Sequence, residues 1–389
     1  MPPARCLGAA GERATGMRIA LLARRFDPKG GGTERDLILT AECLRRGGHQ
    51  VAVYADQIRA ETTALTVHRV GTVPLPRTLA FLRFAVAAAP LARRHGTDLV
   101  LSFARVTSAD VLRSGGSAHV SYLRAVARWR GEVSALRMRL APYHRAQIIV
   151  ERLGFTSSKL RAALAVSELV RRDLIEQFRL PAARVTTIYN GVDLQLFHPE
   201  SDSGARNRIR AQSRIPADAA LVLFVGNGFA RKGLGFLIDA VAKVKSTPYL
   251  MVIGNDRAAT SFQRRTQRRG IAERVIFAGA QPAVAEFFKA GDVLALPSLF
   301  EPFGNVALEA MACGRPALLS AQCGVAELLP EELRDYVVAN PADPAEIASK
   351  LERLLRTAND LRPIARAAAS RFTWEKHELE LNRFIDSVS

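Results

Sequence analysis

The chain has 389 residues, more than one hydrophobic core usually supports, so we expect two domains. Its 48% apolar and 24% charged residues are typical of a folded globular protein and exclude a disordered or fibrous chain. The sequence has no run of about 18 apolar residues, as a membrane-spanning helix would need. Residues 1–16 lack the apolar core of a secretory signal, so we expect a disordered extension before Met17.

The net charge of +18 is unevenly distributed. Residues 1–190 contain 30 Lys and Arg against 14 Asp and Glu, whereas residues 191–389 contain 25 against 23. A solvated, arginine-rich surface explains a basic composition but not this asymmetry. The first half therefore predicts an anionic partner: a phospholipid surface, a phosphorylated acceptor or nucleic acid. The four cysteines are scattered without metal-ligand spacing, which favours reduced thiols in a cytoplasmic protein.

Short apolar runs alternate with helical patterns along the chain. Many of the runs are apolar at consecutive positions, as in parallel strands buried on both faces. The expected strands are 18–23, 50–55, 65–70, 98–103, 163–167, 185–189, 220–226, 249–254, 274–278, 292–296, 316–320 and 336–339. The clearest helical patterns are 33–46, 231–245, 259–269, 344–356 and 374–387. This order predicts an α/β fold with two doubly wound domains, and the turn and proline signals at 190–199 indicate the break between them.

Ligands of doubly wound sheets bind at the carboxyl ends of the strands, so the loops there are candidate sites. The first is the glycine loop 30–32, where the backbone of Gly31 and Gly32 can approach a phosphate and Thr33 can cap the next helix. Alone, this pattern is equally typical of a tight turn.

A second candidate follows the first strand of the second half, where Arg231 and Lys232 come after Gly228. Two adjacent cations can neutralise a diphosphate. We expect them at a helix start, where the helix dipole disfavours positive charge, so an anionic ligand would account for their placement. The alternative is an exposed basic helix start.

The third candidate is the segment 301–309, which begins with Glu301 and ends with Glu309. Glu301 follows a strand, and Glu309 lies about one turn into the next helix among Val306 and other apolar residues. A freely solvated carboxylate is unusual in that setting, and a bound ribose would satisfy it. The alternative is a turn glutamate followed by a solvated helix glutamate.

These segments together resemble the retaining glycosyltransferases of family 4, which have the GT-B fold. The segment 301–309 resembles their pair of glutamates seven residues apart, and the similarity extends over most of the chain from Met17. Within the family, the chain is most similar to the lipopolysaccharide core glucosyltransferases. The other matching segments are 30–36, 46–51, 190–193, 228–233, 254–257 and 277–279.

The resemblance implies a role for each of these residues. Glu309 would bind the ribose hydroxyls, Glu301 the donor sugar, and Arg231 and Lys232 the leaving diphosphate. His119 would lie near the donor sugar and Asp110 would orient the acceptor hydroxyl, although either could equally be a structural residue. Further donor-binding residues would be Gly31, Gly32, Gly228, Asp256, Phe303, Gly304, Asn305 and Val306.

The resemblance also implies the substrates and the domains. We expect retaining transfer of a hexose, glucose from UDP-glucose, to a lipid-linked acceptor such as the lipopolysaccharide core. UDP-GlcNAc, UDP-galactose and GDP-mannose remain alternative donors, and no metal or other cofactor is expected because the chain has no Asp-x-Asp motif. The acceptor domain would span 17–190, the nucleotide-sugar domain 191–372, and a crossover helix 373–389.

Residues 113–152 contain eight arginines and two glutamates. Apolar residues from Tyr122 to Leu140 recur there at helical spacing, with Arg124, Arg128, Arg130, Arg137 and Arg139 between them. The pattern predicts a basic amphipathic helix on a membrane surface, or an ordinary helix packed on its own domain. The resemblance implies that this surface is the cytoplasmic face of the inner membrane.

Two other classes of protein deserve comparison with this prediction. A dinucleotide-dependent oxidoreductase shares the fold class, but G-x-G-x-x-G follows neither first strand. A non-catalytic nucleic-acid-binding protein fits the charge, but stacking, zinc and helix-turn-helix motifs are missing. We therefore expect a nucleotide sugar, a glycan acceptor and a membrane surface as partners, and no nucleic acid.

Overall fold

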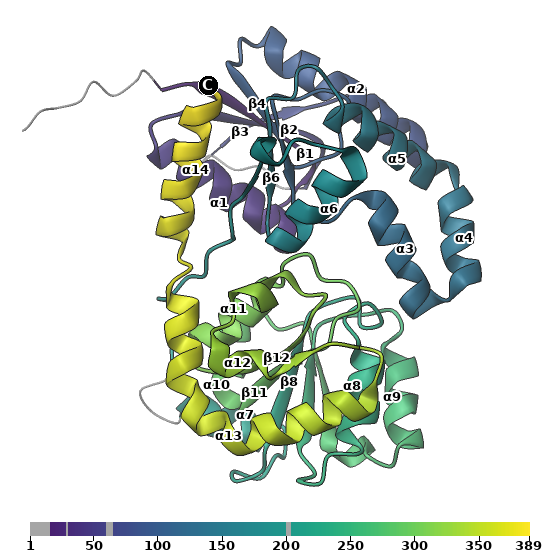
Figure 1. Cartoon of the computed structure of the whole chain (residues 1–389), viewed down its shortest axis with the longest axis vertical. Helices are drawn as coiled ribbons and strands as arrows, with labels where there is room; N and C mark the ends of the chain where they lie inside the picture. Colours follow the sequence, from purple (N-terminus) through teal and green to yellow (C-terminus); the bar gives the residue numbers. More distant parts are fainter. Residues whose placement is uncertain (1–15, 29, 60–64, 200–203) are drawn as a thin grey trace, which may run out of the picture.

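The computed structural model describes residues 16–28, 30–59, 65–199 and 204–389, so the expected N-terminal extension lies outside it except for Gly16. The described chain forms two α/β domains, one above the other in Figure 1. Each domain is built on a parallel sheet with helices on both faces, which confirms the doubly wound fold predicted from the sequence.

The N-terminal sheet has seven described strands in the order β3-β2-β1-β4-β5-β6-β7. Strands such as β4 and β6 are buried at every position, because helices cover both of their faces. The strands are β1 (Arg18–Phe26), β2 (Gln50–Ile58), β3 (Thr66–Arg69), β4 (Leu99–Ser102), β5 (Val111–Ser114), β6 (Ala162–Ala165) and β7 (Val185–Thr187). The helices are α1 (Gly32–Arg46), α2 (Arg77–Arg94), α3 (His119–Arg130), α4 (Glu132–Leu140), α5 (Pro142–Phe155) and α6 (Glu168–Phe178).

The C-terminal sheet has six described strands in the order β10-β9-β8-β11-β12-β13. They are β8 (Leu221–Val225), β9 (Tyr249–Ile253), β10 (Val275–Gly279), β11 (Val293–Leu296), β12 (Ala317–Ser320) and β13 (Val337–Val338). The helices are α7 (Gly204–Gln212), α8 (Leu234–Val241), α9 (Ala259–Arg268), α10 (Val284–Ala290), α11 (Asn305–Ala312), α12 (Glu331–Arg334), α13 (Pro344–Ser370) and α14 (Trp374–Val388).

Three elements differ from the sequence prediction. Strand β5 was not predicted, because Arg113 interrupts its short apolar run. Helix α8 begins at Leu234 and not at 231, because Gly233 takes a left-handed conformation with φ of +80° just before it. Helix α13 continues past the expected end at 356 to Ser370 and accommodates Pro363 in its interior.

The C-terminal helix α14 returns to the N-terminal domain and lies beside α1 (Figure 1). Leu381, Phe384 and Ile385 of this helix are buried in the N-terminal core, as the expected crossover helix requires. The chain thus passes between the domains twice, and the two passages touch. The amide of Val192 donates to the carbonyl of Phe372 over 2.9 Å.

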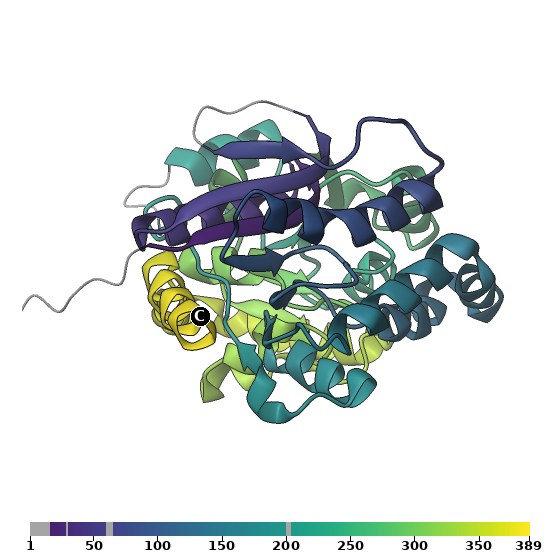
Figure 2. The same cartoon turned by 90° about the horizontal axis from the view of Figure 1, so that it is seen from above.

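The basic region 113–152 is not one amphipathic helix. Gly131, with φ of +79°, separates α3 from α4, and Pro142 begins α5. Val126 is buried in the domain, whereas Val133, Leu136 and Leu140 on α4 are 65%, 55% and 64% exposed. Both views place these helices on the side of the molecule opposite α14 (Figures 1 and 2). Among the described residues, no helix combines the length and apolarity needed to cross a membrane.

Candidate active site

The two domains meet through loops at the carboxyl ends of their strands. Ser167, after β6, donates a hydrogen bond of 2.7 Å from its hydroxyl to the carbonyl of Pro302, after β11. The carboxylate of Glu327 accepts from the amides of Glu168 and Leu169 at the start of α6. The ligand-binding edges of the two sheets therefore face each other across the domain boundary.

Glu301 is paired with both predicted cations. Its Oε2 atom lies 2.6 Å from Lys232 Nζ and 3.1 Å from Arg231 Nη1, and its side chain is 12% exposed. Burial raises the pKa of Glu301, but Lys232 and Arg231 outweigh it, and the pKa falls below its ordinary value. The carboxylate is therefore ionised at neutral pH, suited to accept hydrogen bonds from hydroxyls and not to donate a proton.

Arg231 and Lys232 lie in turns that precede α8, not at a helix start as the sequence suggested. They still lie close to the positive end of α8, and Glu301 supplies the balancing charge. Gly226 makes room for Lys232, because a Cβ there would lie 2.6 Å from Lys232 Cε. The lysine is consequently held within reach of Glu301.

Asp256 braces the turn that carries these cations. Its Oδ2 accepts from the amide of Phe229 over 2.8 Å, directly after Gly228, whose φ is +75°. Asp256 also lines a cavity of about 490 Å³ together with Asn255 and Phe277. The structure thus gives Asp256 a local role in shaping the loop.

Glu309 is joined to the other domain. Its Oε1 lies 3.1 Å from Nη1 of Arg35 on α1. Burial raises the pKa of Glu309 above its ordinary value, although Arg35 works in the opposite direction. Gly304 begins α11 with φ of +101°, and a Cβ there would lie 2.8 Å from Cys323 Sγ, so the helix start requires glycine. Val306 follows half-buried, whereas Phe303 is buried.

A buried polar network continues from this contact. Asn190 donates from Nδ2 to Asp36 over 3.1 Å and to Asn305 over 2.9 Å, and Arg113 donates to Asn190 Oδ1 over 2.8 Å. It connects α1, β5, the passage between domains and α11. Burial raises the pKa of Asp36, while Arg113 and the two asparagines oppose the shift. From the sequence, a binding role was expected only for Asn305, although the matching segments 30–36 and 190–193 contain Asp36 and Asn190.

The glycine loop reaches the same contact. Helix α1 begins at Gly32 with Gly31 as its N-cap, and no side chain caps it, so the capping role expected for Thr33 is wrong. Among the described residues, no atom lies within 4 Å of where a Cβ on Gly32 would be, so the backbone there leaves room for a ligand. Gly31 lies one helical turn before Arg35, whose amide donates to the Gly31 carbonyl over 3.0 Å and whose side chain pairs with Glu309.

The structure does not bring Asp110 to the domain boundary. It precedes β5, at the amino end of the strand, and its carboxylate accepts from Val100 N over 2.8 Å and from Arg93 over 3.1 Å. These contacts brace β4 and β5, so its position speaks against a role with the acceptor hydroxyl.

His119 is buried at the start of α3. Its Nε2 lies 3.0 Å from Nδ1 of His144, and its ring stacks on Tyr122, which in turn packs against Phe300 next to Glu301. Burial, with Arg105 and His144, lowers the pKa of His119 to about 3, so the ring is neutral at pH 7. His119 is thus near the Glu301 loop but separated from it by Tyr122.

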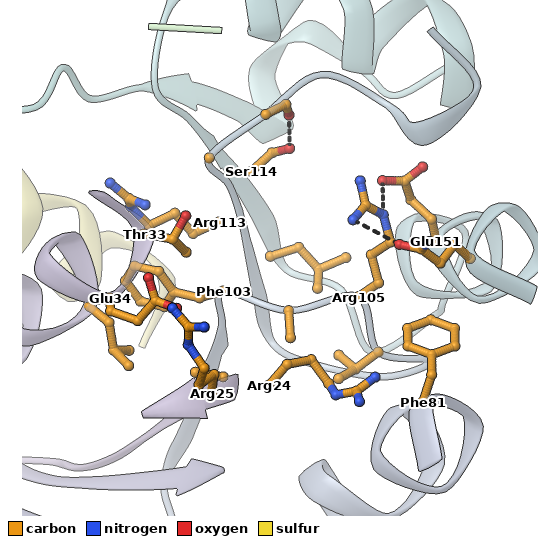
Figure 3. Close-up of a pocket in the computed structure, with 18 of the residues that line it drawn as sticks. Arg24, Arg25, Thr33, Glu34, Phe81, Phe103, Arg105, Arg113, Ser114 and Glu151 are labelled. Atoms are coloured by element: carbon orange, nitrogen blue, oxygen red, sulfur yellow. Dashed lines mark hydrogen bonds and ion pairs between the residues drawn. The ribbon is translucent and has the colours of Figure 1, made fainter. Parts of the chain in front are cut away.

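A cavity of about 590 Å³ opens at the carboxyl edge of the N-terminal sheet (Figure 3). The residues labelled around it come from β1, α1, α2, the loop after β4, β5 and α5. Among those lining it are Arg24, Arg25, Arg77, Arg105 and Arg113. Several of these arginines are paired, for example Arg25 with Glu34 and Arg105 with Glu151. Sequence reasoning had predicted a basic half but not this cavity, because its lining comes from separate strands.

The family comparisons divide the chain as the fold does. Residues 205–371 match the family of glycosyl transferases group 1, and residues 30–196 match glycosyltransferase family 4. The Escherichia coli lipopolysaccharide glucosyltransferase WaaG is 26% identical over 346 residues, 87% of this chain and 90% of that protein. A D-inositol 3-phosphate glycosyltransferase of Xylanimonas cellulosilytica is 31% identical over 231 residues. That alignment spans 55% of this chain and about half (54%) of the relative, and the one with the glycosyltransferase MJ1607 of Methanocaldococcus jannaschii likewise spans 50% of that protein.

Solved structures show the same fold. The crystal structure of WaaG has a TM-score of 0.79 at 22% identity and covers 94% of this chain and 99% of that one. The Anabaena protein HepE in complex with UDP-glucose has a TM-score of 0.73 at 20% identity, with 95% and 100% covered. The architecture is therefore GT-B.

Proposed function

The chain belongs to glycosyltransferase family 4, group 1, and we propose that it transfers glucose from UDP-glucose, with retention, to a lipid-linked glycan such as the lipopolysaccharide core. The observation that carries this proposal is the cluster of Arg231, Lys232 and Glu301. It combines two cations for a departing diphosphate with one ionised acceptor for sugar hydroxyls. The likeness to WaaG over 87% of the chain supports the acceptor class.

Each charged group then has a step to perform. As the bond between the sugar and the diphosphate breaks, negative charge develops on the diphosphate, and Arg231 and Lys232 stabilise it without a metal ion. Glu301 holds the donor sugar, and Glu309 accepts from the ribose hydroxyls once they replace Arg35. The open backbone at Gly32 and the start of α11 face the donor from opposite domains.

The acceptor binds in the cavity lined by Arg24, Arg25, Arg77 and Arg105. It lies in the other domain from the donor cations, at the edge of the sheet where ligands of doubly wound folds bind. Its lining contains five arginines and two glutamates, so it favours an acceptor with phosphate or carboxylate groups.

The donor sugar is tested by a screen of nucleotide sugars. Purified protein is incubated with UDP-glucose, UDP-galactose, UDP-GlcNAc or GDP-mannose and a truncated-core lipopolysaccharide, and nucleotide release is measured. We expect release above background with UDP-glucose alone. Release with another donor would correct the sugar, and no release with any of the four would contradict the proposed function.

The protein acts at the cytoplasmic surface of the inner membrane. Helix α4 supports this proposal, because it exposes Val133, Leu136 and Leu140 beside Arg137 and Arg139. Arginines near anionic lipid headgroups contribute about 1 kcal/mol each, and the exposed apolar side chains can enter the headgroup region.

A further inference from the structure

Helix α3 is fixed at its beginning to the N-terminal domain. The amide of Ala118 donates to Asp173 over 2.6 Å, and the amide of His119 donates to Glu151 over 2.7 Å. Leu123 is fully buried. The helix is therefore a rigid arm of the acceptor domain, and it runs from there toward the C-terminal domain (Figure 1).

Helix α3 also contacts the C-terminal domain, through Arg128 near its end and Tyr122 in its first turn. Arg128 donates from Nη1 to the carbonyl of Leu299 over 3.2 Å and to Oε1 of Gln322 over 3.0 Å. The ring of Tyr122 meets Phe300 edge-on, with centroids 5.7 Å apart and planes at 68°. The contacts to Leu299 and Phe300 fall on residues 299–302, which we call the donor loop, and the third falls on Gln322.

The donor loop carries Glu301 and is also tied to its own domain. The amide of Leu299 donates to the carbonyl of Arg231 over 2.8 Å, and the amide of Glu301 donates to the carbonyl of Gln322 over 3.0 Å. Gln322 is thus shared, since its side chain accepts from Arg128 while its backbone holds Glu301. A displacement of α3 would therefore be passed to Glu301 through a single residue, Gln322.

We propose that Arg128 and Tyr122 are positioning residues that set the place of Glu301 from the acceptor domain. This inference rests on the proposed function of Glu301 as a ligand of the donor sugar. Glu301 takes the position needed for sugar transfer only when α3 contacts the donor loop. The position of the acceptor domain therefore sets the orientation of the donor sugar. We expect nucleotide affinity to depend less on this contact than transfer does, because Arg231, Lys232 and Glu309 lie outside the donor loop and Arg128 contacts none of them.

Arg128→Ala tests the proposal, with Arg124→Ala as the matched control. Arg124 lies one turn earlier on α3, carries the same charge, and donates to Gln177 of its own domain over 3.3 Å. With UDP-glucose and truncated-core lipopolysaccharide, we expect Arg128→Ala to lower kcat about ten- to a hundredfold, as misplaced groups do. UDP affinity by calorimetry should stay within about twofold of wild type. Arg128→Lys should recover part of the loss, and Gln322→Ala should add little to Arg128→Ala because both act on one contact.

Hydrogen exchange provides a readout that does not need activity. Amides of the donor loop should exchange faster in Arg128→Ala than in Arg124→Ala, with the rest of the domain unchanged. Equal exchange and equal kcat in the two variants would overturn the inference, as would a parallel loss of UDP affinity in Arg128→Ala. An inactive wild-type protein would contradict the proposed function, while the exchange comparison would still decide whether α3 holds the loop.

Discussion

Arg35 Nη1 and Glu309 Oε1 lie 3.1 Å apart, on helices of different domains. The carboxylate proposed for the ribose is thus paired with a residue of the acceptor domain. Arg35 is 44% exposed at its side chain, whereas Glu309 is 14% exposed, so the arginine can leave into solvent when a nucleotide arrives. On donor binding, Glu309 would lose its ion pair with Arg35 and gain hydrogen bonds from the ribose hydroxyls.

This exchange predicts the effect of Glu309→Gln. The variant loses a charged acceptor for two hydroxyls, so we expect UDP affinity to fall about tenfold, the cost of one or two such hydrogen bonds. Pyrophosphate has no ribose and should bind the variant as it binds the wild type. Calorimetric titration with both compounds measures the difference. An equal loss for UDP and pyrophosphate would place Glu309 elsewhere than at the ribose.

Lys232→Ala and Glu301→Gln should lower turnover in distinguishable ways. Removing the lysine takes away half of the proposed charge stabilisation, so both kcat and UDP affinity should fall, kcat by about 10²- to 10³-fold. Glu301→Gln leaves both cations free for the diphosphate, so kcat should fall while UDP affinity is kept or increased. Lys243→Ala, at an exposed site, is the control. Near-normal nucleotide release in either active-site variant would refute the assigned roles.

His377 predicts an acid-dependent loss of stability. It lies on α14, with Nδ1 2.7 Å from the carbonyl of Tyr189, and burial lowers its pKa from 6.5 to about 4. The unfolded chain takes up a proton near pH 6.5 and the native chain only near pH 4. The contribution of neutral His377 to the free energy of unfolding is therefore complete above pH 6.5. It falls as the pH drops toward 4, by about 2 kcal/mol between pH 7 and pH 5. Urea unfolding of wild type and His377→Gln at both pH values measures it, and the variant should lose less stability on acidification. An identical pH dependence in the two proteins would show that His377 titrates normally.

Helix α4 predicts salt-sensitive binding to anionic vesicles. Flotation with phosphatidylglycerol vesicles should recover the wild-type protein at low salt and less of it at high salt, because counterions screen its arginines. The double variant Leu136→Asp and Leu140→Asp should remain unbound. Leu379→Asp changes a side chain of similar exposure (51%) on α14 and should bind like wild type. Failure of the wild type to float at low salt would exclude this surface.

The sequence singled out Arg231, Lys232 and Glu301 because each lies in a local motif after a predicted strand. Glu301 follows β11 and Lys232 follows β8, and these strands are neighbours in the sheet, so a parallel order was enough to bring them together. Arg35 and Arg128 carried no such signal, since their partners are 274 and 171 residues away. Strand β5 was not predicted because it contains the charged Arg113. The partner of Arg113, Asp36, becomes its neighbour only after folding. Short sequence motifs therefore predict which residues lie at the end of a strand, but not which residues from distant parts of the chain contact them.

The two passages between the domains meet side by side at Val192 and Phe372. A Cβ on Gly191 would lie 2.5 Å from the amide nitrogen of Trp374, so little space separates them. A pair of adjacent covalent connections resists twisting and sliding of one domain over the other, while it permits bending about a single axis through the pair. We therefore expect the domains to move relative to each other mainly by bending at this pair of connections. Separation of Arg35 from Glu309, which lie on different domains, would use that bending.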